Sequence, residues 1–326
     1  MSLLAAMLLF VIADPRINEA SGIAASIVDP QVVYVQNDSG DAPRFFALDA
    51  RTGRTAATYT VPGATNVDWE DLAVARNRRG VASVWLADIG DNDAGRADVC
   101  IYRVDERRAG TAVEPPEVWR LRYPDGPHDA ESLAVAPGGA AFIVTKSLLG
   151  SSAVYAVPPR PSGVQTLRKI GEIRFALTGT LGGPNVVGEL AATGAAFSRD
   201  GTVFAVRTYT DAYLWRVAHG DVAAALRAAP VRVPLPAQPQ GEGIAVAGSR
   251  LLIDSEGRGS AVYALPLPRA AGTSLTPSSS PTPHPTSTPE EQQESRDPFP
   301  IGIVAAALAV AGALAVWLRR VVSRRR

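Results

Sequence analysis

The chain has 326 residues, of which 46% are hydrophobic and 20% are charged, enough for one large domain or two small ones. Five of its 32 basic residues are arginines within residues 319–326, and the rest carries 27 basic against 32 acidic side chains. A mildly acidic remainder argues against nucleic acid as a partner, and a single cysteine, Cys100, excludes an internal disulfide or a cysteine metal cluster.

The N-terminal residues 1–13 contain an apolar run, residues 3–13, with the length of a signal-peptide core. No basic residue precedes this run, although signal peptides usually have one. We predict a signal peptide that either lacks its true start or runs into the mature protein.

Residues 14–272 repeat one phrase, in which an acid and small or turn residues precede a short apolar strand. Copies begin at Glu19, Glu70, Glu131 and Glu242, and a copy without the acid begins at Thr193. The five copies start 51, 61, 62 and 49 residues apart. This period suits units of four short strands, as in the blades of a β-propeller.

Each copy is followed by further short apolar or aromatic runs bounded by Gly, Pro and Asp, which is typical of strands and turns. The predicted strands are 21–26, 32–36, 44–50, 55–61, 71–75, 83–88, 99–104, 118–123, 132–136, 141–145, 153–157, 165–175, 194–198, 203–208, 212–217, 231–235, 244–247, 251–254 and 261–265. The last unit lacks a fourth strand, which we expect near residues 14–17, closing the ring. We predict an all-β propeller of about five four-stranded blades, or six if a long connection hides one, with a two-sheet sandwich as the alternative.

Inner strands of a propeller line its channel, so the repeated acids are expected to meet at one opening. Like charges at close range need a cation, basic partners or solvent. Carboxylates suit calcium, whereas three histidines and one cysteine argue against a dedicated zinc site. The predicted metal ligands are Glu19, Glu70, Asp88, Glu131 and Glu242. The predicted ligand-binding residues are Asp38, Asp91, Asn92, His128, Asp129, Lys146, Arg207, Asp254 and Glu256. The alternative is that these acids cap backbone amides or pair with Lys146 and Arg207.

The C-terminal segments indicate membrane attachment. Residues 273–299 are rich in Pro, Ser and Thr and predict a disordered stalk. Residues 300–318 carry no charge over 19 positions, enough for a transmembrane α-helix, and residues 319–326 form a basic cytoplasmic tail. This order predicts a single-pass plasma-membrane protein with residues 14–272 outside the cell; a tail-anchored cytoplasmic protein is the competing topology.

Several phrases resemble a family of exported, membrane-anchored actinobacterial β-propeller proteins, most of them uncharacterised. They are NDSGDAPRFFALDARTGRT (37–55), DWEDLAVA (68–75), LADIGDN (86–92), RYPDGPHDAESLAV (122–135) and RTYTDAYLW (207–215). More distantly, the pattern is similar to phytase-like and NHL-like propellers. The phytase-like resemblance implies that carboxylates around the channel hold calcium, with Glu70, Asp88, Glu131 and Glu242 at matching positions; the basic cluster that grips phosphate is not evident.

The sequence favours a non-enzymatic binding or scaffold module that engages a protein, glycan or small-molecule ligand through its acidic channel face, with calcium as the candidate cofactor. A metal-dependent hydrolase of phosphate esters is the second hypothesis, in which Lys146, Arg207 and His128 would grip phosphate. A purely structural envelope protein is the third. The sequence contains no GxSxG, phosphate-loop or HExxH motif that would indicate a reaction.

Overall fold

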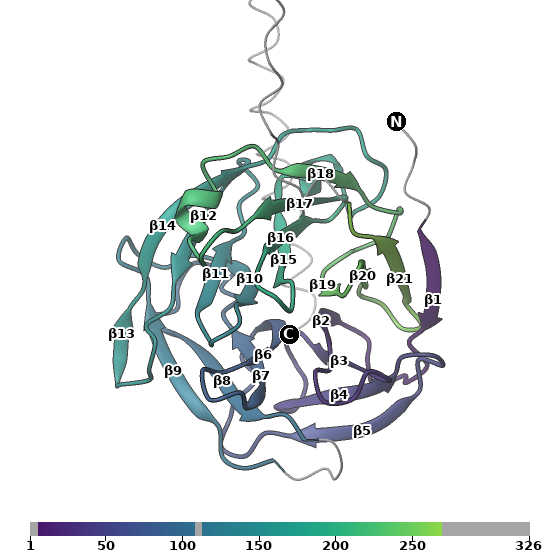
Figure 1. Ribbon diagram of the computed structural model, residues 1–326, viewed down its shortest axis with the longest axis horizontal. Helices are drawn as coiled ribbons and strands as arrows, with labels where there is room; N and C mark the ends of the chain where they lie inside the picture. Colours follow the sequence, from purple (N-terminus) through teal and green to yellow (C-terminus); the bar gives the residue numbers. More distant parts are fainter. Residues whose placement is uncertain (1–5, 108–112, 269–326) are drawn as a thin grey trace, which may run out of the picture. The chain divides into compact units, whose positions relative to one another are not determined.

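The computed structural model describes residues 6–107 and 113–268. Its described strands form five sheets arranged around one axis, so the fold is an all-β, five-bladed propeller (Figure 1). The first blade consists of β2 (Ala20–Ala25), β3 (Val32–Asn37), β4 (Arg44–Asp49) and β5 (Thr55–Thr60), and the second of β6 (Trp69–Arg76), β7 (Ala82–Asp88), β8 (Val99–Asp105) and β9 (Glu117–Arg122). The third blade consists of β10 (Ala130–Val135), β11 (Ala141–Thr145), β12 (Ser151–Ala156) and β14 (Arg168–Arg174). The fourth consists of β15 (Ala192–Phe197), β16 (Val203–Thr208), β17 (Asp211–Arg216) and β18 (Val231–Pro234).

The fifth blade joins both ends of the domain. It consists of β19 (Ile244–Ala247), β20 (Arg250–Ile253), β21 (Ala261–Pro266) and, as its outer strand, β1 (Met7–Val11). Strands β1 and β21 pair antiparallel, with Met7 opposite Ala264 and Val11 opposite Ala261. The closing strand therefore lies at Met7–Val11, inside the predicted signal-peptide segment, and not near residues 14–17 as expected.

The predicted strands agree closely with the observed ones, and the five-bladed propeller is confirmed. One difference is that the predicted strand 165–175 is two strands, because β13 (Val164–Thr166) pairs in parallel with β9 of the preceding blade. Two short helical segments, η1 (Val186–Leu190) and α1 (Val222–Ala225), lie in connections between strands. Within the described ranges no helix is long and apolar enough to cross a bilayer. The predicted stalk, membrane span and tail all lie beyond these residues.

A β-bulge recurs on the inner strand of four blades. In β6, Trp69 pairs with Asp88 and Asp71 with Ala87, so Glu70 is the extra residue. The register shifts in the same way at Ser21, Glu131 and Thr193. A bulge bends its strand and redirects one side chain. The sequence repeat is therefore a structural repeat that places one side chain per blade at the same height along the channel.

The axis is narrow just below these bulges, and Asp71 fills it. Its Oδ1 accepts the Leu72 N–H at 2.8 Å, and its Oδ2 accepts the N–H groups of Leu133 at 2.8 Å and Ala195 at 3.1 Å. The equivalent residue of the first blade is Gly22, where an added Cβ would lie 2.8 Å from Asp71 Oδ1. Asp71 thus links three inner strands and separates the two ends of the channel.

Candidate metal centre

The channel mouth on one side of Asp71 is lined by buried carboxylates. Glu70, Glu131 and Glu242 are 3%, 5% and 3% exposed, and each stands directly before the level of Asp71 in its blade. Ser21 and Thr193 occupy the equivalent bulge positions in the other two blades. The inner strands therefore supply three buried acids to one opening.

Two groups of three carboxylates lie within reach of a single ion each, and they share Glu70. One group is Asp38, Asp68 and Glu70, and the other is Glu70, Asp129 and Glu131. In each group, one oxygen from every residue lies within 4.8 Å of the others. Calcium binds oxygens at about 2.3–2.6 Å, so oxygens on opposite sides of one ion are about 5 Å apart. The spacing of both groups fits that requirement.

Several oxygens at this mouth have no hydrogen-bond partner among the described residues. They are Oδ1 of Asp38, Oε2 of Glu131 and Oε2 of Glu242. An unsatisfied buried oxygen costs about 1–3 kcal/mol, and more when it is charged. These three atoms are therefore free to coordinate a cation. A metal site requires such free oxygens as well as suitable spacing of the carboxylates.

Burial raises the pKa values of these acids, and their mutual repulsion raises them further. The pKa of Glu131 is raised to about 7, chiefly by burial, and Asp38, beside Asp68, is raised to about 8. Burial and the charge of Glu131 hold the pKa of Glu70 well above its usual value, and burial raises that of Asp68. Burial and repulsion thus favour the protonated forms of these acids, and a bound cation would instead favour their ionised forms.

One lysine enters the site. Lys146 Nζ donates a hydrogen bond to Glu131 Oε1 and lies 5.5 Å from the centre of the Tyr209 ring. Burial pulls the pKa of Lys146 down, but the adjacent Glu131 carboxylate outweighs this effect and the pKa is raised. Lys146 therefore remains a cation, yet the two three-carboxylate groups together contain five acids.

Gly90 packs directly against the first group of acids. A Cβ added there would lie 2.2 Å from Glu70 Oε1 and 2.5 Å from Asp68 Oδ2. The Gly90 N–H donates to the Asp68 carbonyl at 3.1 Å, and its own carbonyl accepts from Arg96 Nη1 at 2.7 Å. A residue without a side chain is required here so that both carboxylates can approach the backbone.

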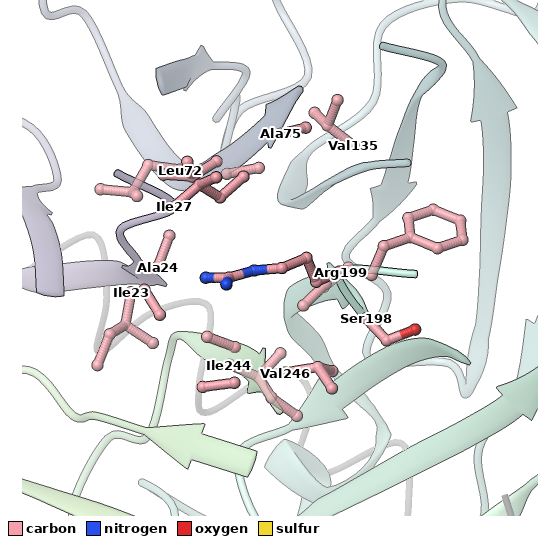
Figure 2. Close-up of a pocket in the computed structure, with 18 of the residues that line it drawn as sticks. Ile23, Ala24, Ile27, Leu72, Ala75, Val135, Ser198, Arg199, Ile244 and Val246 are labelled. Atoms are coloured by element: carbon pink, nitrogen blue, oxygen red, sulfur yellow. The ribbon is translucent and has the colours of Figure 1, made fainter. Parts of the chain in front are cut away.

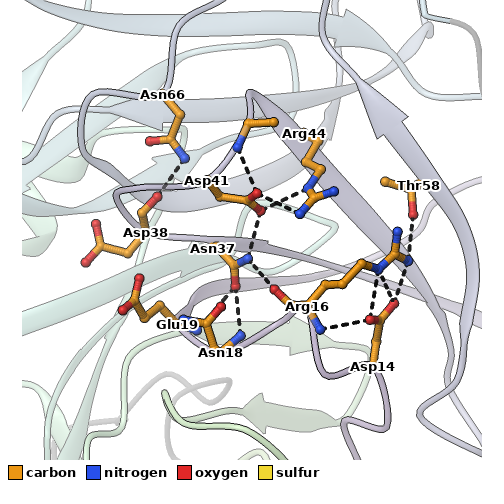
Figure 3. Close-up of polar contacts among 11 residues, drawn as sticks. Asp14, Arg16, Asn18, Glu19, Asn37, Asp38, Asp41, Arg44, Thr58 and Asn66 are labelled. Atoms are coloured by element: carbon orange, nitrogen blue, oxygen red, sulfur yellow. Dashed lines mark hydrogen bonds and ion pairs between the residues drawn. The ribbon is translucent and has the colours of Figure 1, made fainter.

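Asp38 is positioned by its backbone, which leaves its carboxylate available. Asn66 Nδ2 donates to the Asp38 carbonyl oxygen at 2.6 Å, while the Asp38 carboxylate extends away from this contact (Figure 3). The preceding residue, Asn37, accepts the N–H groups of Asn18 and Glu19 at 3.2 Å each. This network fixes the loop that carries Asp38.

Glu19 has a different position from the other repeated acids. The strand register makes Ser21, two residues later, the equivalent of Glu70, and Ser21 Oγ donates to Glu70 Oε2 at 3.3 Å. Glu19 instead lines a polar cleft of about 650 Å³ that also contains Asn18 and Arg258. Glu19 belongs to neither of the three-carboxylate groups found among the described residues.

Asp88 and Asp91 contact protein groups, although Asp88 Oδ2 has no partner among the described residues. Asp88 Oδ1 accepts the Asp68 N–H at 3.1 Å and pairs with Arg96 at 2.9 Å. Asp91 accepts the N–H groups of Gly95 and Arg96 at 2.8 Å each, and its own N–H donates to Asp129 Oδ1 at 3.0 Å. These acids support the loop beside the mouth. Asn92, next to Asp91, is exposed.

Arg207 and Asp254 are buried, and Glu256 nearby in the chain is half-buried. Arg207 donates hydrogen bonds to four backbone carbonyls and to Gln238. Asp254 Oδ1 accepts the Gly243 N–H at 2.7 Å, and Glu256 accepts a hydrogen bond from Gln240. Burial raises the pKa of Asp254 to about 6 and that of Glu256 to about 7.

His128 is engaged elsewhere. Its Nε2 lies 3.0 Å from Asp125 Oδ1 and 3.2 Å from the Tyr155 hydroxyl. Arg207 and His128 are thus held by other groups, and of the three residues considered for a phosphate grip only Lys146 touches the carboxylate groups.

Asp68 is a ligand candidate that the sequence analysis did not single out. It stands two residues before Glu70 in the phrase DWEDLAVA, and residues two apart on an extended chain share a face. The two-residue spacing between Asp68 and Glu70 is the feature of the sequence that could have identified Asp68 as a candidate ligand. Asp71, also in this phrase, could not be distinguished from a surface acid by sequence.

Comparisons with known proteins identify no family for this chain. No family model matches the chain, and no curated protein matches it. The PQQ-bound aldose sugar dehydrogenase of Streptomyces coelicolor superposes with a TM-score of 0.47 at 12% identity, over 80% of this chain and 98% of that one. A gluconolactonase of Xanthomonas campestris gives a TM-score of 0.43 at 14% identity, over 81% and 89%. Similarity at this level carries no inference about activity or substrate.

Proposed function

We propose that this protein is a calcium-dependent binding module, carried outside the cell on the predicted stalk and membrane helix. The observation that carries the proposal is the pair of three-carboxylate groups sharing Glu70, with buried, unpartnered oxygens on Glu131 and Asp38. A cation held there at the channel mouth would offer its remaining coordination positions to a ligand from outside.

The donor set favours calcium over other common metals. All the grouped ligands are carboxylates, which are hard oxygen donors, and neither histidine nor cysteine takes part. Calcium accepts six to eight oxygens in flexible geometry, whereas magnesium demands a near-ideal octahedron and keeps several waters. Zinc prefers nitrogen and sulfur ligands.

The site supports binding better than phosphate-ester hydrolysis. A hydrolase of that kind needs cations that grip the phosphate; among the described residues Lys146 contacts the carboxylate groups, whereas Arg96, beside Asp68, is held by Asp88 and the Gly90 carbonyl. Lys146 already neutralises part of Glu131. A purely structural role would require internal pairing of the acids, but Asp254, Asp88 and Glu131 each pair through one oxygen and keep a buried second oxygen with no partner among the described residues.

The test is calcium binding by the full-length chain, compared between two glycine variants. Gly90→Ala places a methyl group against Glu70 and Asp68, whereas Gly95→Ala, in the same loop, meets no atom within 4 Å. A cation at 100 times its dissociation constant should stabilise the wild type by about 2.7 kcal/mol. We expect Gly95→Ala to keep this calcium-induced shift in melting temperature and Gly90→Ala to lose most of it.

The outcomes are distinguishable. Equal shifts in both glycine variants would mean that calcium binds somewhere other than beside Gly90. No shift in the wild type with calcium, magnesium or manganese would leave internal pairing as the role of these acids. The proposed topology is tested separately, because protease added to intact cells should release a soluble propeller fragment.

A further inference from the structure

The opposite end of the channel contains a cavity with a different chemistry. Its volume is about 150 Å³, and it lies between the inner strands (Figure 2). Its lining residues follow Asp71 and its equivalents in the chain, whereas the inner-strand carboxylates of the mouth precede them. Ile23, Leu72 and Ile244, each one residue beyond the level of Asp71 in its blade, form part of its wall. The cavity exists because many of the inner-strand residues beyond them are alanines.

The wall is mostly apolar. Aliphatic side chains from β2, β6, β15 and β19 make most of the lining, and Ser198 and Arg199 add polar groups. Arg76 also lines the cavity, but its Nη1 donates to the Gly80 carbonyl at 2.7 Å. No carboxylate lines the cavity as the structure describes it. A guanidinium beside an apolar space, with no negative charge in the lining, is complementary to an anion that carries an apolar body.

Arg199 points into this space. Figure 2 shows its side chain extending between Ala24 on one side and Val246 on the other. Its Nη2 donates to the Ser26 carbonyl at 3.1 Å, and no ion pair among the described residues includes Arg199 or Arg76. Two acids lie near this segment and both are engaged: Glu106 accepts from Ser26 Oγ and the Ile27 N–H, and Asp200, which follows Arg199 in the chain, accepts from Ser198 Oγ and the Thr202 N–H.

The guanidinium therefore has donors to spare. A guanidinium carries five N–H groups in a planar fork, which matches the two oxygens of a carboxylate. Arg199 is exposed, so the cavity is open to solvent where this side chain lies. A carboxylate could approach Arg199 from outside while an attached apolar group enters the channel.

We propose that this end of the propeller binds a small aromatic or aliphatic monocarboxylate. The carboxylate pairs with Arg199, and the apolar group fills the space lined by Ala24 and Leu72. An apolar cavity of about 150 Å³ holds one benzene ring. The space is thus sized for one ring or a short chain and is too small for a peptide segment.

This site is independent of the proposed cation. Asp71 accepts backbone N–H groups from β10 and β15 and fills the axis between the two ends. A ligand at Arg199 therefore makes no contact with Glu70 or Glu131. The monocarboxylate should bind equally with calcium and with a chelator, so failure of either proposal leaves the other standing.

The experiment is calorimetric titration of the full-length chain with benzoate and, as a neutral molecule of the same shape, benzamide. We expect benzoate to bind at least about tenfold more tightly, because the charge-assisted pair with Arg199 is available only to the anion. Arg199→Gln should abolish this preference. Arg250→Gln, an exposed arginine at the start of β20 that does not line the cavity, should keep it.

A second variant tests the cavity without changing charge. Ala24→Leu adds three carbons beside the guanidinium and should weaken benzoate by about tenfold or more, while melting temperature shows whether the variant is folded. Absence of benzoate binding at 10 mM, or equal binding of benzoate and benzamide, would overturn the proposal. So would binding that survives both Arg199→Gln and Ala24→Leu, since the ligand would then lie elsewhere.

Discussion

Glu70→Gln should stabilise the protein in chelator and remove its response to calcium. Glu70 belongs to both groups, in which carboxylate oxygens lie within 4.8 Å of one another. At an effective dielectric constant of about 20, two unit charges at that separation repel by about 3.5 kcal/mol. Replacing one charge with an isosteric amide removes this repulsion wherever the acids are ionised, so a gain of up to about 3.5 kcal/mol is expected at pH 8.

Bound calcium should make the Glu70 charge stabilising instead of destabilising. Wild-type protein should gain about 2.7 kcal/mol at 100 times the dissociation constant, equivalent to a rise of several degrees in melting temperature. The Glu70→Gln variant should gain less than about 1 kcal/mol, because both groups lose their shared ligand. The assay is thermal unfolding of full-length wild type and variant at pH 8, with calcium and with chelator.

Glu172→Gln is the matched control, because it makes the same chemical change on the exposed ion pair with Lys169 in β14. Exposed pairs contribute about 0–1 kcal/mol, so this variant should behave as wild type in both buffers. The reasoning is refuted if Glu70→Gln destabilises the chelated protein or keeps the full calcium shift. Either result would mean that Glu70 is stabilised by protein groups and not by a cation.

Three further predictions concern pH, the axis and ring closure. The folded-state pKa of Glu131 is raised to about 7, so protonated Glu131 stabilises the fold fully below about pH 4.5, and this contribution is lost as pH rises through 7. The melting temperature in chelator should therefore fall from pH 5 to pH 8. Glu131→Gln should make that fall smaller. Asp71→Asn should lower the free energy of unfolding, measured in urea, by about 3 kcal/mol, because an amide NH2 would face backbone N–H donors. An unchanged urea midpoint would show that Asp71 does not link the inner strands at the axis. In β1, Phe10 is 5% exposed and Leu8 is 53% exposed. Phe10→Ala should therefore lower the free energy of unfolding by about 3–5 kcal/mol, whereas Leu8→Ala should lower it little. Equal effects of the two substitutions would show that β1 does not close the ring.

The fold was predictable because the repeat is visible in the chain. Short apolar runs bounded by turn residues recur at a nearly constant spacing, and each becomes a strand of the same blade position. The repeated acids also indicated the place of the candidate metal site, since Glu70 and Glu131 belong to the three-carboxylate groups, although Glu242 does not. Periodicity in sequence becomes symmetry in space when every unit packs against its neighbours.

The details of the site were less accessible, because they depend on bulges and loops. A bulge moves a side chain by one position, and the register that identifies Ser21 and not Glu19 as the equivalent of Glu70 is set by pairing with β3. Arginine is a residue type that commonly binds ligands, but Arg207 donates its hydrogen bonds to four backbone carbonyls. Such contacts join residues far apart in sequence, which no local pattern records.

The closure of the ring by β1 and β21 also sets an order of events during synthesis. Ala264, the partner of Met7, is made about 250 residues after it. At a synthesis rate of about 5–20 residues per second, β1 waits roughly 10–50 s before its partner exists. Throughout that interval an apolar strand with an unpaired edge is available to other chains. A nascent propeller is thus most vulnerable to aggregation at its first strand, and a chaperone or translocation channel that holds residues 7–11 would protect it until the last blade is complete.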